Sequence, residues 1–290
     1  MIRRPLPGAA PCPTGNPQPE MIDQPCHFGE WIQGRMGPEG PVALITLLPR
    51  GLYLRAMRRP AKCLSAQLPD RAGGDLERAL PRFLPRFLRD LGLPCRERFI
   101  LRPPFPAGMG AGISTASLVA IARLAGFRGP PEALARACIA AEGASDPLMF
   151  PFPDRLLWAS RQGRVLAHLP PPPRMQLLAG LYGPARPTRA EDTDYDDISD
   201  LVSAWRDAAD ASACAALASE SARRCLARRG PAGDPTEALA RALGAEGWAM
   251  SHSGAARALI FAPGRLPSHA SRLAREAGWR DIRCLFTGEE

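Results

Sequence analysis

Lysine is almost missing from this chain. Lys62 is the only lysine among 37 Lys and Arg residues, so arginine carries nearly all of the positive charge. This skew, together with 33 prolines, is typical of genomic base-composition bias rather than of a selected surface. The arginines are scattered in pairs, such as Arg58 and Arg59 or Arg223 and Arg224, with little aromatic interleaving. Because a nucleic-acid site needs a clustered basic face, the net charge of +8 does not predict nucleic acid as a partner.

Three further patterns are missing. No hydrophobic run approaches the length of a membrane span, although 46% of the residues are hydrophobic. The Pro/Gly-rich N-terminus has no apolar segment of the secretory type. The eight cysteines never form a C-x-x-C pair, which argues against a metal site or a disulfide framework. We therefore expect a cytoplasmic protein without a membrane partner.

The length of 290 residues allows one large domain or two small ones, and we expect two lobes. Residues 1–24 are rich in proline and poor in large apolar side chains, which predicts a flexible arm. Two apolar runs, 42–48 and 51–57, flank a Pro-Arg-Gly break and predict a β-hairpin. Helical spacing covers 75–91, but Pro81 and Pro85 interrupt it, so a helix is expected only from about Pro85.

The rest of the chain mixes both periodicities. A short strand over 99–101 leads into a glycine loop, and a helix over 114–125 follows the loop. The tail alternates strands and helices, which suggests an α+β sandwich with helices on one face of an antiparallel sheet. Further strands are expected near 155–168, 175–182, 247–251, 256–261 and 280–286, and further helices near 131–142, 195–208, 210–228, 235–244 and 267–277.

The glycine loop lies in Pro106–Ala116 (PAGMGAGISTA), with glycines at three alternate positions and Ser114 and Thr115 directly after them. The first amides of a helix have no intrahelical acceptor, and the macrodipole adds partial positive charge, so an anion binds there without a lysine. The two hydroxyls suit a phosphate oxygen or Mg²⁺. The loop therefore fits a nucleotide triphosphate, and it also fits a tight turn with an N-capping Ser or Thr. It matches neither the P-loop pattern nor the Rossmann pattern.

Two other stretches accompany the loop, Cys26–Gly34 (CHFGEWIQG) and Gly247–Gly254 (GWAMSHSG). Together the three resemble, in the same order, the motifs of the GHMP kinases, which act on galactose, homoserine, mevalonate and phosphomevalonate. The forms GEWIQG, STA and SHSG are most similar to the L-threonine kinases of cobalamin biosynthesis, which make O-phospho-L-threonine. Gly143–Phe150 (GASDPLMF) resembles the E-P-T-D-x-x-M-F segment of that family. The resemblance covers residues 22–286.

The resemblance implies a two-lobed α+β fold. After the arm over 1–24, a ribosomal-protein-S5-like N-terminal domain over 25–160 would bind ATP. A ferredoxin-like C-terminal domain would cover 161–290. The implied reaction uses ATP and Mg²⁺ and transfers the γ-phosphoryl group to the hydroxyl of L-threonine.

The resemblance also implies roles for single residues. Asp146 would lie at the acceptor hydroxyl, as a general base or as a group that orients it, and would act in catalysis together with Ser114. Ser114 and Glu142 would hold Mg²⁺. The residues expected to wrap the ATP phosphates are Pro106, Gly108, Gly110, Ala111, Gly112, Ser114 and Thr115, and those expected around the acceptor are Glu30, Gln33, Ser251, His252, Ser253 and Gly254.

Plain structural roles stay open for several of these residues. Glu30 also fits a surface charge, His252 a structural histidine, and Asp146 a turn residue before Pro147. The acidic stretch that holds Asp192, Asp194, Asp196 and Asp197 fits a metal cluster or an acidic helix entry capped by Asp192 or Thr193.

The chain departs from the family at three positions. Ile113 stands where a serine is usual, Ser117 where the threonine kinases tend to have an acid, and Ala255 where a threonine is usual. These departures leave open a different acceptor or a non-catalytic nucleotide-binding relative.

Overall fold

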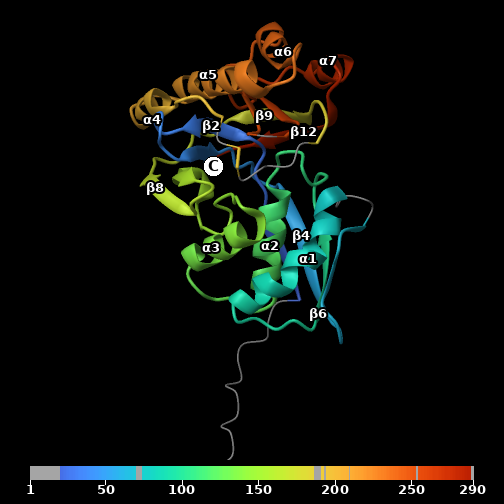
Figure 1. Ribbon diagram of the computed structural model, residues 1–290. Helices are drawn as coiled ribbons and strands as arrows, with labels where there is room; N and C mark the ends of the chain where they lie inside the picture. Colours follow the sequence, from blue (N-terminus) through green and yellow to red (C-terminus); the bar gives the residue numbers. More distant parts are fainter. Residues whose placement is uncertain are drawn as a thin grey trace, which may run out of the picture.

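The computed structural model describes residues 20–69, 74–185, 191–192, 194–208, 210–252 and 254–288. Two sheets organise this part of the chain (Figure 1). The four-stranded sheet has the order β1 (Met21–Pro25), β4 (Tyr53–Pro60), β6 (Glu97–Arg102) and β5 (Ser65–Gln67). The eight-stranded sheet has the order β12 (Arg280–Phe286), β9 (Gln176–Leu181), β11 (Ala256–Phe261), β10 (Gly247–Met250), β2 (Glu30–Arg35), β3 (Val42–Thr46), β7 (Leu156–Ala159) and β8 (Arg164–His168).

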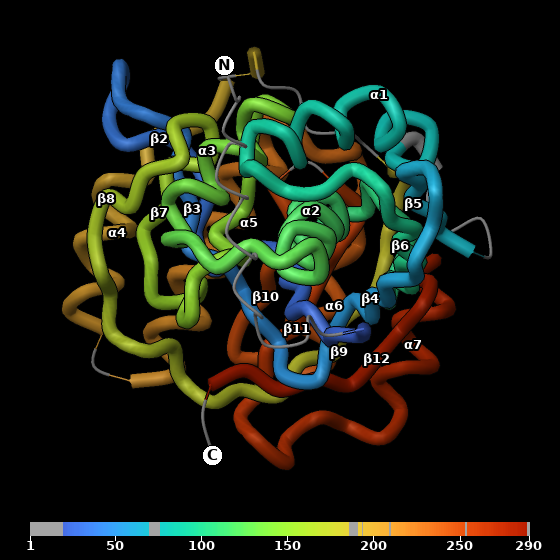
Figure 2. The backbone as a smooth tube through the Cα atoms, turned by 90° about the horizontal axis from the view of Figure 1, so that it is seen from below, coloured from blue at the N-terminus to red at the C-terminus, as the bar shows by residue number. Residues whose placement is uncertain are grey.

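Helix α2 (Ile113–Leu124) is the centre of the lower part of the molecule. It packs on β1 and β4, and Figure 2 shows it between α1 (Gly74–Asp90) and α3 (Pro131–Glu142). Ten of its twelve residues are buried, which explains why its sequence is apolar or small on every side. A helix packed all round has little freedom to move, so its N-terminus is a fixed point.

The remaining helices cover the outer face of the eight-stranded sheet (Figure 1). Helix α5 (Ala211–Arg229) lies on β10 and β2, next to α4 (Ser199–Arg206), while α6 (Thr236–Ala242) lies on β11 and β10. Helix α7 (Ala270–Glu276) contacts β12. A short 3₁₀ helix, η2, covers Pro153–Arg155. The α+β class and the alternation predicted for the tail are confirmed.

The predicted hairpin is wrong. Its first run is β3, which pairs with β2 and β7 in the eight-stranded sheet. Its second run is β4, which pairs with β1 and β6 in the four-stranded sheet. The Pro-Arg-Gly break therefore carries the chain from one sheet to the other. Its local sequence favours a turn but does not specify the partner strand.

The predicted start of the first helix is also wrong, because α1 runs through both prolines. One face of α1 buries Leu80, Leu84 and Leu88, while Pro81 is exposed and Pro85 half-buried. Burying each large apolar side chain stabilises the fold by about 1.5–3 kcal/mol, against a cost of about 3 kcal/mol for an interior proline. Several buried side chains together outweigh two prolines.

The ends of other segments differ as well. The predicted arm ends too late, because Met21–Pro25 forms β1, and its residues 1–19 lie outside the described residues. The helix predicted from residue 195 begins at Ser199. The predicted domain boundary after residue 160 falls inside the β7–β8 hairpin, so the eight-stranded sheet joins strands from both sides of it. No helix in the described ranges is both long and apolar enough to cross a bilayer.

Candidate active site

The glycine loop connects β6 to α2, whose N-terminus points toward the eight-stranded sheet (Figure 1). Gly108, Gly110 and Gly112 all have left-handed backbone, with φ of 80°, 83° and 64°. A Cβ on Gly110 would lie 2.2 Å from Cβ of Ser251, and one on Gly112 would lie 2.2 Å from Cδ2 of His27. A Cβ on Gly108 would meet only Ala185, at 3.5 Å. Two of the three glycines therefore make room for neighbouring segments of the protein.

Hydrogen bonds tie the loop to the first and third motifs. The amide of Gly29 donates to the carbonyl of Gly110 at 3.2 Å, and the amide of Ala256 donates to the carbonyl of Met109 at 2.8 Å. The third motif forms a tight turn, in which the amide of Gly254 donates to Oγ of Ser251 at 3.0 Å. The three motifs, far apart in sequence, therefore meet at the N-terminus of α2.

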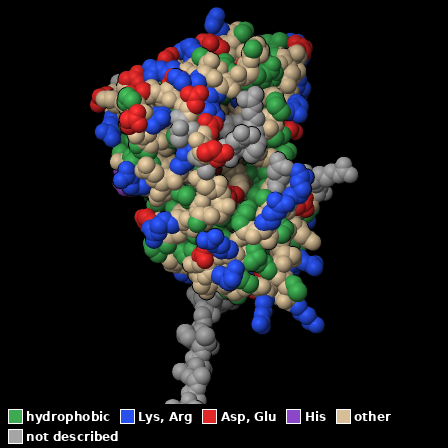
Figure 3. Space-filling model, in the orientation of Figure 1, with side chains coloured by type: hydrophobic (Ala, Val, Ile, Leu, Met, Phe, Trp, Pro, Cys, Tyr) green, Lys and Arg blue, Asp and Glu red, His purple; other side chains and the backbone are tan. Residues whose placement is uncertain are grey.

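A cavity of about 680 Å³ lies at this meeting point, and Figure 3 shows the molecule hollowed at mid-height on this face. That volume suits a nucleotide with a small co-substrate. The first amides of α2 have no intrahelical acceptor, and none of the described side chains caps this end. The cavity therefore presents a ready anion site at its floor. Its polar walls include His27, Glu30, Ser114, Glu142, Asp146, Ser160, Arg161 and His252.

His27 and Asp146 form an ion pair in this cavity. Nε2 of His27 lies 3.1 Å from Oδ2 of Asp146, while its Nδ1 lies 3.3 Å from the carbonyl oxygen of Gly29. Both neighbours are acceptors, so the arrangement favours a proton on each ring nitrogen, which is the imidazolium form. Burial lowers the pKa of His27, but the charges of Asp146 and Glu30 outweigh it and raise this pKa to about 9. Burial raises the pKa of Asp146, but His27 outweighs it and holds this pKa below its usual value.

Asp146 is held in place from behind. Its amide donates to Oγ1 of Thr115 at 3.2 Å. The preceding carbonyl, of Ser145, accepts from Nε1 of Trp158 at 2.6 Å. The Asp146 side chain is 23% exposed, whereas that of His27 is 4% exposed. The carboxylate therefore faces the cavity, while hydrogen bonds fix its backbone and the charged His27 ring lies on its buried side.

Glu30 sits on the other side of His27, with Oε1 at 3.7 Å from Nδ1. Burial raises the pKa of Glu30 to about 8, although the charge of His27 opposes this. Oε2 has no hydrogen-bond partner among the described residues. Glu30 is therefore protonated near neutral pH, and the alternative that it is a surface charge is wrong because the residue is buried and lines the cavity.

His27, Glu30 and Asp146 place their ligand atoms close enough to hold a metal ion, and no other such group of His, Cys, Asp and Glu occurs in the described residues. An imidazolium has no lone pair to give, so the ion pair argues against a metal there. Ser114 and Glu142 suit Mg²⁺ better. The Ser114 hydroxyl donates to Oε1 of Glu142 beside the N-terminus of α2. Mg²⁺ prefers oxygen ligands such as these, which it binds together with phosphate oxygens. Burial, followed by the charge of Asp146, raises the pKa of Glu142 to about 8, so its proton would leave when a cation binds.

Some predicted site residues lie elsewhere. Gln33 does not line the cavity; its Nε2 donates to the carbonyl of Met250 at 3.0 Å and ties β2 to β10. Gly254 supports the loop from behind, because a Cβ there would lie 2.4 Å from the amide of Gly110. Ser117 is fully buried and donates to the carbonyl of Ile113 at 2.7 Å, so it does not replace an acid in the cavity. Ser253 lies outside the described residues.

The acidic stretch is bound to arginines of α5. Arg229 pairs with Asp192, Arg228 with Asp194 and Asp196, and Arg224 with Asp200. Oδ1 of Asp197 accepts from the amide of Ser199 at 2.9 Å, directly before α4, whose N-cap residue is Ile198. The stretch leads into a helix, as the helix-entry interpretation predicted, but Asp192 pairs with Arg229 and does not cap α4. Thr193 lies outside the described residues.

Sequence reasoning missed several wall residues, among them His27 and Arg161. His27 lies inside the first motif, next to the glycine and the glutamate, so its position was a usable signal. No sequence signal pointed to Arg161, because it is one of many arginines and lies in a turn between two strands.

Comparison with family models and with curated proteins finds no match for this sequence. Solved structures do match. A phosphotransferase related to the CoA biosynthesis pathway superposes with a TM-score of 0.62 at 14% identity, over 93% of this chain and 96% of the other. Homoserine kinase from Cytophaga hutchinsonii gives 0.61 at 15% identity, over 95% and 98%. Mevalonate kinase from L. major, solved with R-mevalonate, gives 0.58 at 14% identity, over 95% and 99%.

The fold is that of the GHMP kinases. At identities this low the superpositions establish the fold alone, so the reaction has to be argued from the site. In the GHMP fold of this chain, the cavity, the uncapped end of α2 and the Asp146 carboxylate occur together.

Proposed function

We propose that this protein is an ATP- and Mg²⁺-dependent kinase that phosphorylates the hydroxyl of a small molecule, with L-threonine as the acceptor and O-phospho-L-threonine, an intermediate for cobalamin, as the product. One observation carries the kinase proposal. An ionised, rigidly held Asp146 faces the same cavity as the uncapped N-terminus of α2. A triphosphate on the helix end and a hydroxyl on the carboxylate would therefore be neighbours.

In the proposed reaction the acceptor hydroxyl donates its hydrogen bond to Asp146. The hydroxyl oxygen forms a bond to the γ-phosphorus, the bond from that phosphorus to the β-bridging oxygen breaks, and ADP leaves. Asp146 either accepts the hydroxyl proton as a general base or orients the hydroxyl until late in the transfer. His27 keeps the carboxylate charged and fixed in direction. Amides of the glycine loop and of the first turn of α2 bind the phosphate oxygens. Mg²⁺, when bound by Ser114 and Glu142, would neutralise charge that develops on the phosphates.

L-threonine as the acceptor rests on the forms GEWIQG, STA and SHSG of the three motifs. Another acceptor, such as homoserine or a sugar, is compatible with the same fold. A non-catalytic nucleotide-binding protein is favoured by one observation: Ile113 lines the cavity where the family usually has a hydroxyl. The amides of the loop and Ser114 remain available for phosphate binding in either case.

Phosphorus NMR tests these proposals directly. The protein is incubated with ATP and Mg²⁺ in parallel tubes that contain L-threonine, L-serine, homoserine or galactose. We expect a phosphomonoester to appear fastest with L-threonine. A faster signal from another tube would overturn the acceptor and keep the kinase. Absence of product in every tube, with ATP still raising the melting temperature, would favour the non-catalytic binder.

A further inference from the structure

Four arginines gather on the outer face of the four-stranded sheet, although the sequence scatters them. Arg55 of β4 lies directly opposite Arg102 of β6, and Arg59 lies opposite Arg98. All four are exposed, whereas most of the residues that alternate with them are buried on the side of the sheet where α2 packs (Figure 2). Like charges directly opposite each other destabilise a sheet, so this arrangement favours an anion over the face.

Few carboxylates neutralise this face. Arg55 pairs with Asp23 of β1, with Nε 2.8 Å from Oδ1. The other three arginines form no ion pair within the ranges that the structure describes. The chain before β1 cannot supply the missing charge, because residues 1–19 contain neither Asp nor Glu. The four arginines and one aspartate therefore leave the face strongly positive.

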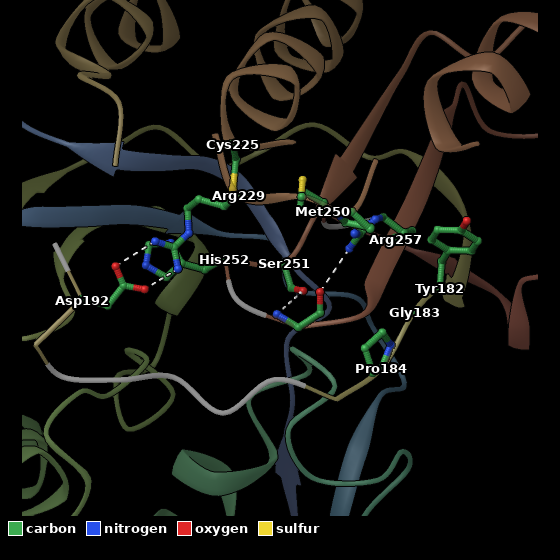
Figure 4. A pocket seen from close by; sticks show the side chains of 13 residues that line it. Tyr182, Gly183, Pro184, Asp192, Cys225, Arg229, Met250, Ser251, His252 and Arg257 are labelled. Carbon is green, nitrogen blue, oxygen red and sulfur yellow. Dashed lines mark hydrogen bonds and ion pairs between the residues drawn. The ribbon is translucent and has the colours of Figure 1, made fainter. Parts of the chain in front are cut away.

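The abundance of arginine in this chain does not explain the missing carboxylates. The arginines of α5, over the eight-stranded sheet, each pair with at least one acid, as Figure 4 shows for Arg229 and Asp192. The other pairs are Arg223 with Glu237, Arg224 with Asp200 and Arg228 with Asp196. Acidic residues thus accompany the arginines on one sheet and not on the other, so the excess charge is particular to the outer face of the four-stranded sheet.

Apolar side chains lie between the two arginine pairs. Met57 of β4 is opposite Ile100 of β6 and opposite Met21 of β1, so the three form a row across the sheet. Each arginine pair lies two residues from this row, which is about 7 Å along the strands. Met21 is 53% exposed, and Tyr53, further along the same face of β4, is 46% exposed. The face therefore combines phosphate-binding groups with exposed apolar side chains.

We propose that this outer face binds a membrane surface that contains anionic phospholipids. Guanidinium groups match lipid phosphates with paired hydrogen bonds. Met21 and Tyr53 would enter the boundary between headgroups and acyl chains, where tyrosine is favoured. A second copy of the chain, placed face to face, would bring like charges together. One exposed tyrosine offers nucleic-acid bases little to stack on.

The expectation of no membrane partner rested on the lack of a spanning segment, and a protein bound to the lipid surface needs none. The four arginines do not line the cavity of the candidate active site, so this inference is independent of the proposed function.

Sedimentation of the full chain with lipid vesicles tests the proposal. Vesicles of phosphatidylcholine alone are compared with vesicles that contain about one third phosphatidylglycerol. We expect binding to the anionic vesicles only, and it should weaken as the salt concentration rises because the charges are screened. Each arginine near an anionic surface strengthens binding by about fivefold, so Arg59→Gln combined with Arg98→Gln should weaken it by about 25-fold.

A matched double variant controls for net charge. Arg265→Gln combined with Arg275→Gln removes the same charge from exposed arginines far from this sheet in sequence, and its binding should stay within about twofold of the wild type. The Arg59 and Arg98 variant should melt no earlier than the wild type, because it removes a like-charge pair. An equal loss of vesicle binding in both double variants would assign the effect to net charge and overturn the proposed face.

Three further results would overturn the lipid proposal. One is equal sedimentation with the two kinds of vesicle, and another is no sedimentation with either. The third is tighter binding of an RNA oligonucleotide or of poly-L-glutamate than of the anionic vesicles, lost in the Arg59 and Arg98 variant, which would assign the face to a nucleic acid or to an acidic protein. Kinase activity measured without vesicles should be the same in both double variants, so it reports on the proposed function separately.

Discussion

His27 donates to Asp146 from the buried side of the cavity wall, with Nε2 of the ring 3.1 Å from Oδ2 of the carboxylate. The pair joins the first motif to the segment after α3, so two distant parts of the chain must both be in place before the carboxylate is charged and oriented. The one lysine of the chain, Lys62, is exposed and does not line the cavity. In this protein the cation next to the candidate base is therefore a histidine, whose charge depends on pH.

Asp146→Asn should lower turnover by about 10²- to 10⁴-fold, because an amide accepts no proton and carries no charge. The nucleotide affinity should change by less than threefold, since the phosphates contact the loop and α2 rather than this side chain. Steady-state kinetics and ATP titration measure the two effects separately. Asp90→Asn, on an exposed carboxylate at the end of α1, is the matched control and should behave as the wild type. Full turnover in the Asp146 variant would remove this residue from the mechanism.

The His27–Asp146 pair predicts an alkaline limit to activity. The pKa of His27 is raised to about 9, so the imidazolium is present at neutral pH and is lost as the pH rises through about 9. Turnover of the wild type should fall over that range while the protein remains folded. In His27→Gln the cation that most opposes the effect of burial on Asp146 is absent, so the pKa of Asp146 rises and activity is impaired most at acid and neutral pH.

A profile of turnover against pH, with circular dichroism at each pH, distinguishes these curves. His168→Gln, on an exposed histidine of β8, should keep the wild-type profile. An unchanged alkaline limb in the His27 variant would assign that limb to another group.

Glu30 gives a prediction for stability rather than for activity. Its pKa is raised from 4.5 to about 8 in the folded protein, so between these values the folded state holds a proton that the unfolded state has lost. By linkage, the free energy of unfolding must fall as the pH rises through this window. Glu30→Gln removes that dependence, because glutamine imitates the protonated acid at every pH. Its melting temperature should be close to that of the wild type at pH 5 and higher at pH 9.

Thermal unfolding monitored by circular dichroism at pH 5, 7 and 9 measures this effect. Glu39→Gln, on an exposed turn between β2 and β3, should follow the wild type at all three values. A constant difference between the Glu30 variant and the wild type across the range would mean that Glu30 is ionised in both states.

The glycine loop shows which features of the site the local sequence can predict. Three glycines at alternate positions before a helix predicted a phosphate cradle, and the cavity does lie over the N-terminus of α2. The reason for two of those glycines was not in the local sequence. Gly110 and Gly112 leave room for Ser251 and His27, which come from distant segments. Local sequence specifies the backbone conformation of a loop, whereas its neighbours depend on the whole fold.

The same limit explains the errors in the strands and in the site. The runs that became β3 and β4 were recognised as strands, but their partners are set by the two sheets and not by the turn between them. Gln33 was assigned to the acceptor because it belongs to the first motif, yet it alternates with Ile32 along β2 and bonds to the β10 backbone. Arg161 lies in the turn between β7 and β8, and the fold, not the local sequence, brings that turn to the cavity wall.

Gly110→Ala tests the close approach of the motifs. The new Cβ would lie 2.2 Å from Cβ of Ser251 in backbone with φ of 83°, so both a clash and left-handed strain oppose it. Gly92→Ala is the matched control, because φ is 68° there and nothing lies within 4 Å of the new Cβ. The control should lose about 1–2 kcal/mol from strain alone, and Gly110→Ala should lose at least about 2 kcal/mol more from overpacking. Equal losses in denaturant unfolding would show that the two motifs separate without cost.

The Ser114–Glu142 contact predicts how the protein depends on Mg²⁺. If both oxygens hold the ion together with the phosphates, removing either should raise the Mg²⁺ concentration for half-maximal turnover by about tenfold, as loss of one charge-assisted contact implies. Saturating Mg²⁺ should restore most of the turnover in Ser114→Ala and less of it in Glu142→Gln, since only the second variant loses a charge. Kinetics at fixed ATP with varied Mg²⁺ give this comparison, with Ser203→Ala on the exposed face of α4 as the control. A turnover lost equally at every Mg²⁺ concentration would place Ser114 and Glu142 in the structure of the helix end and not at the ion.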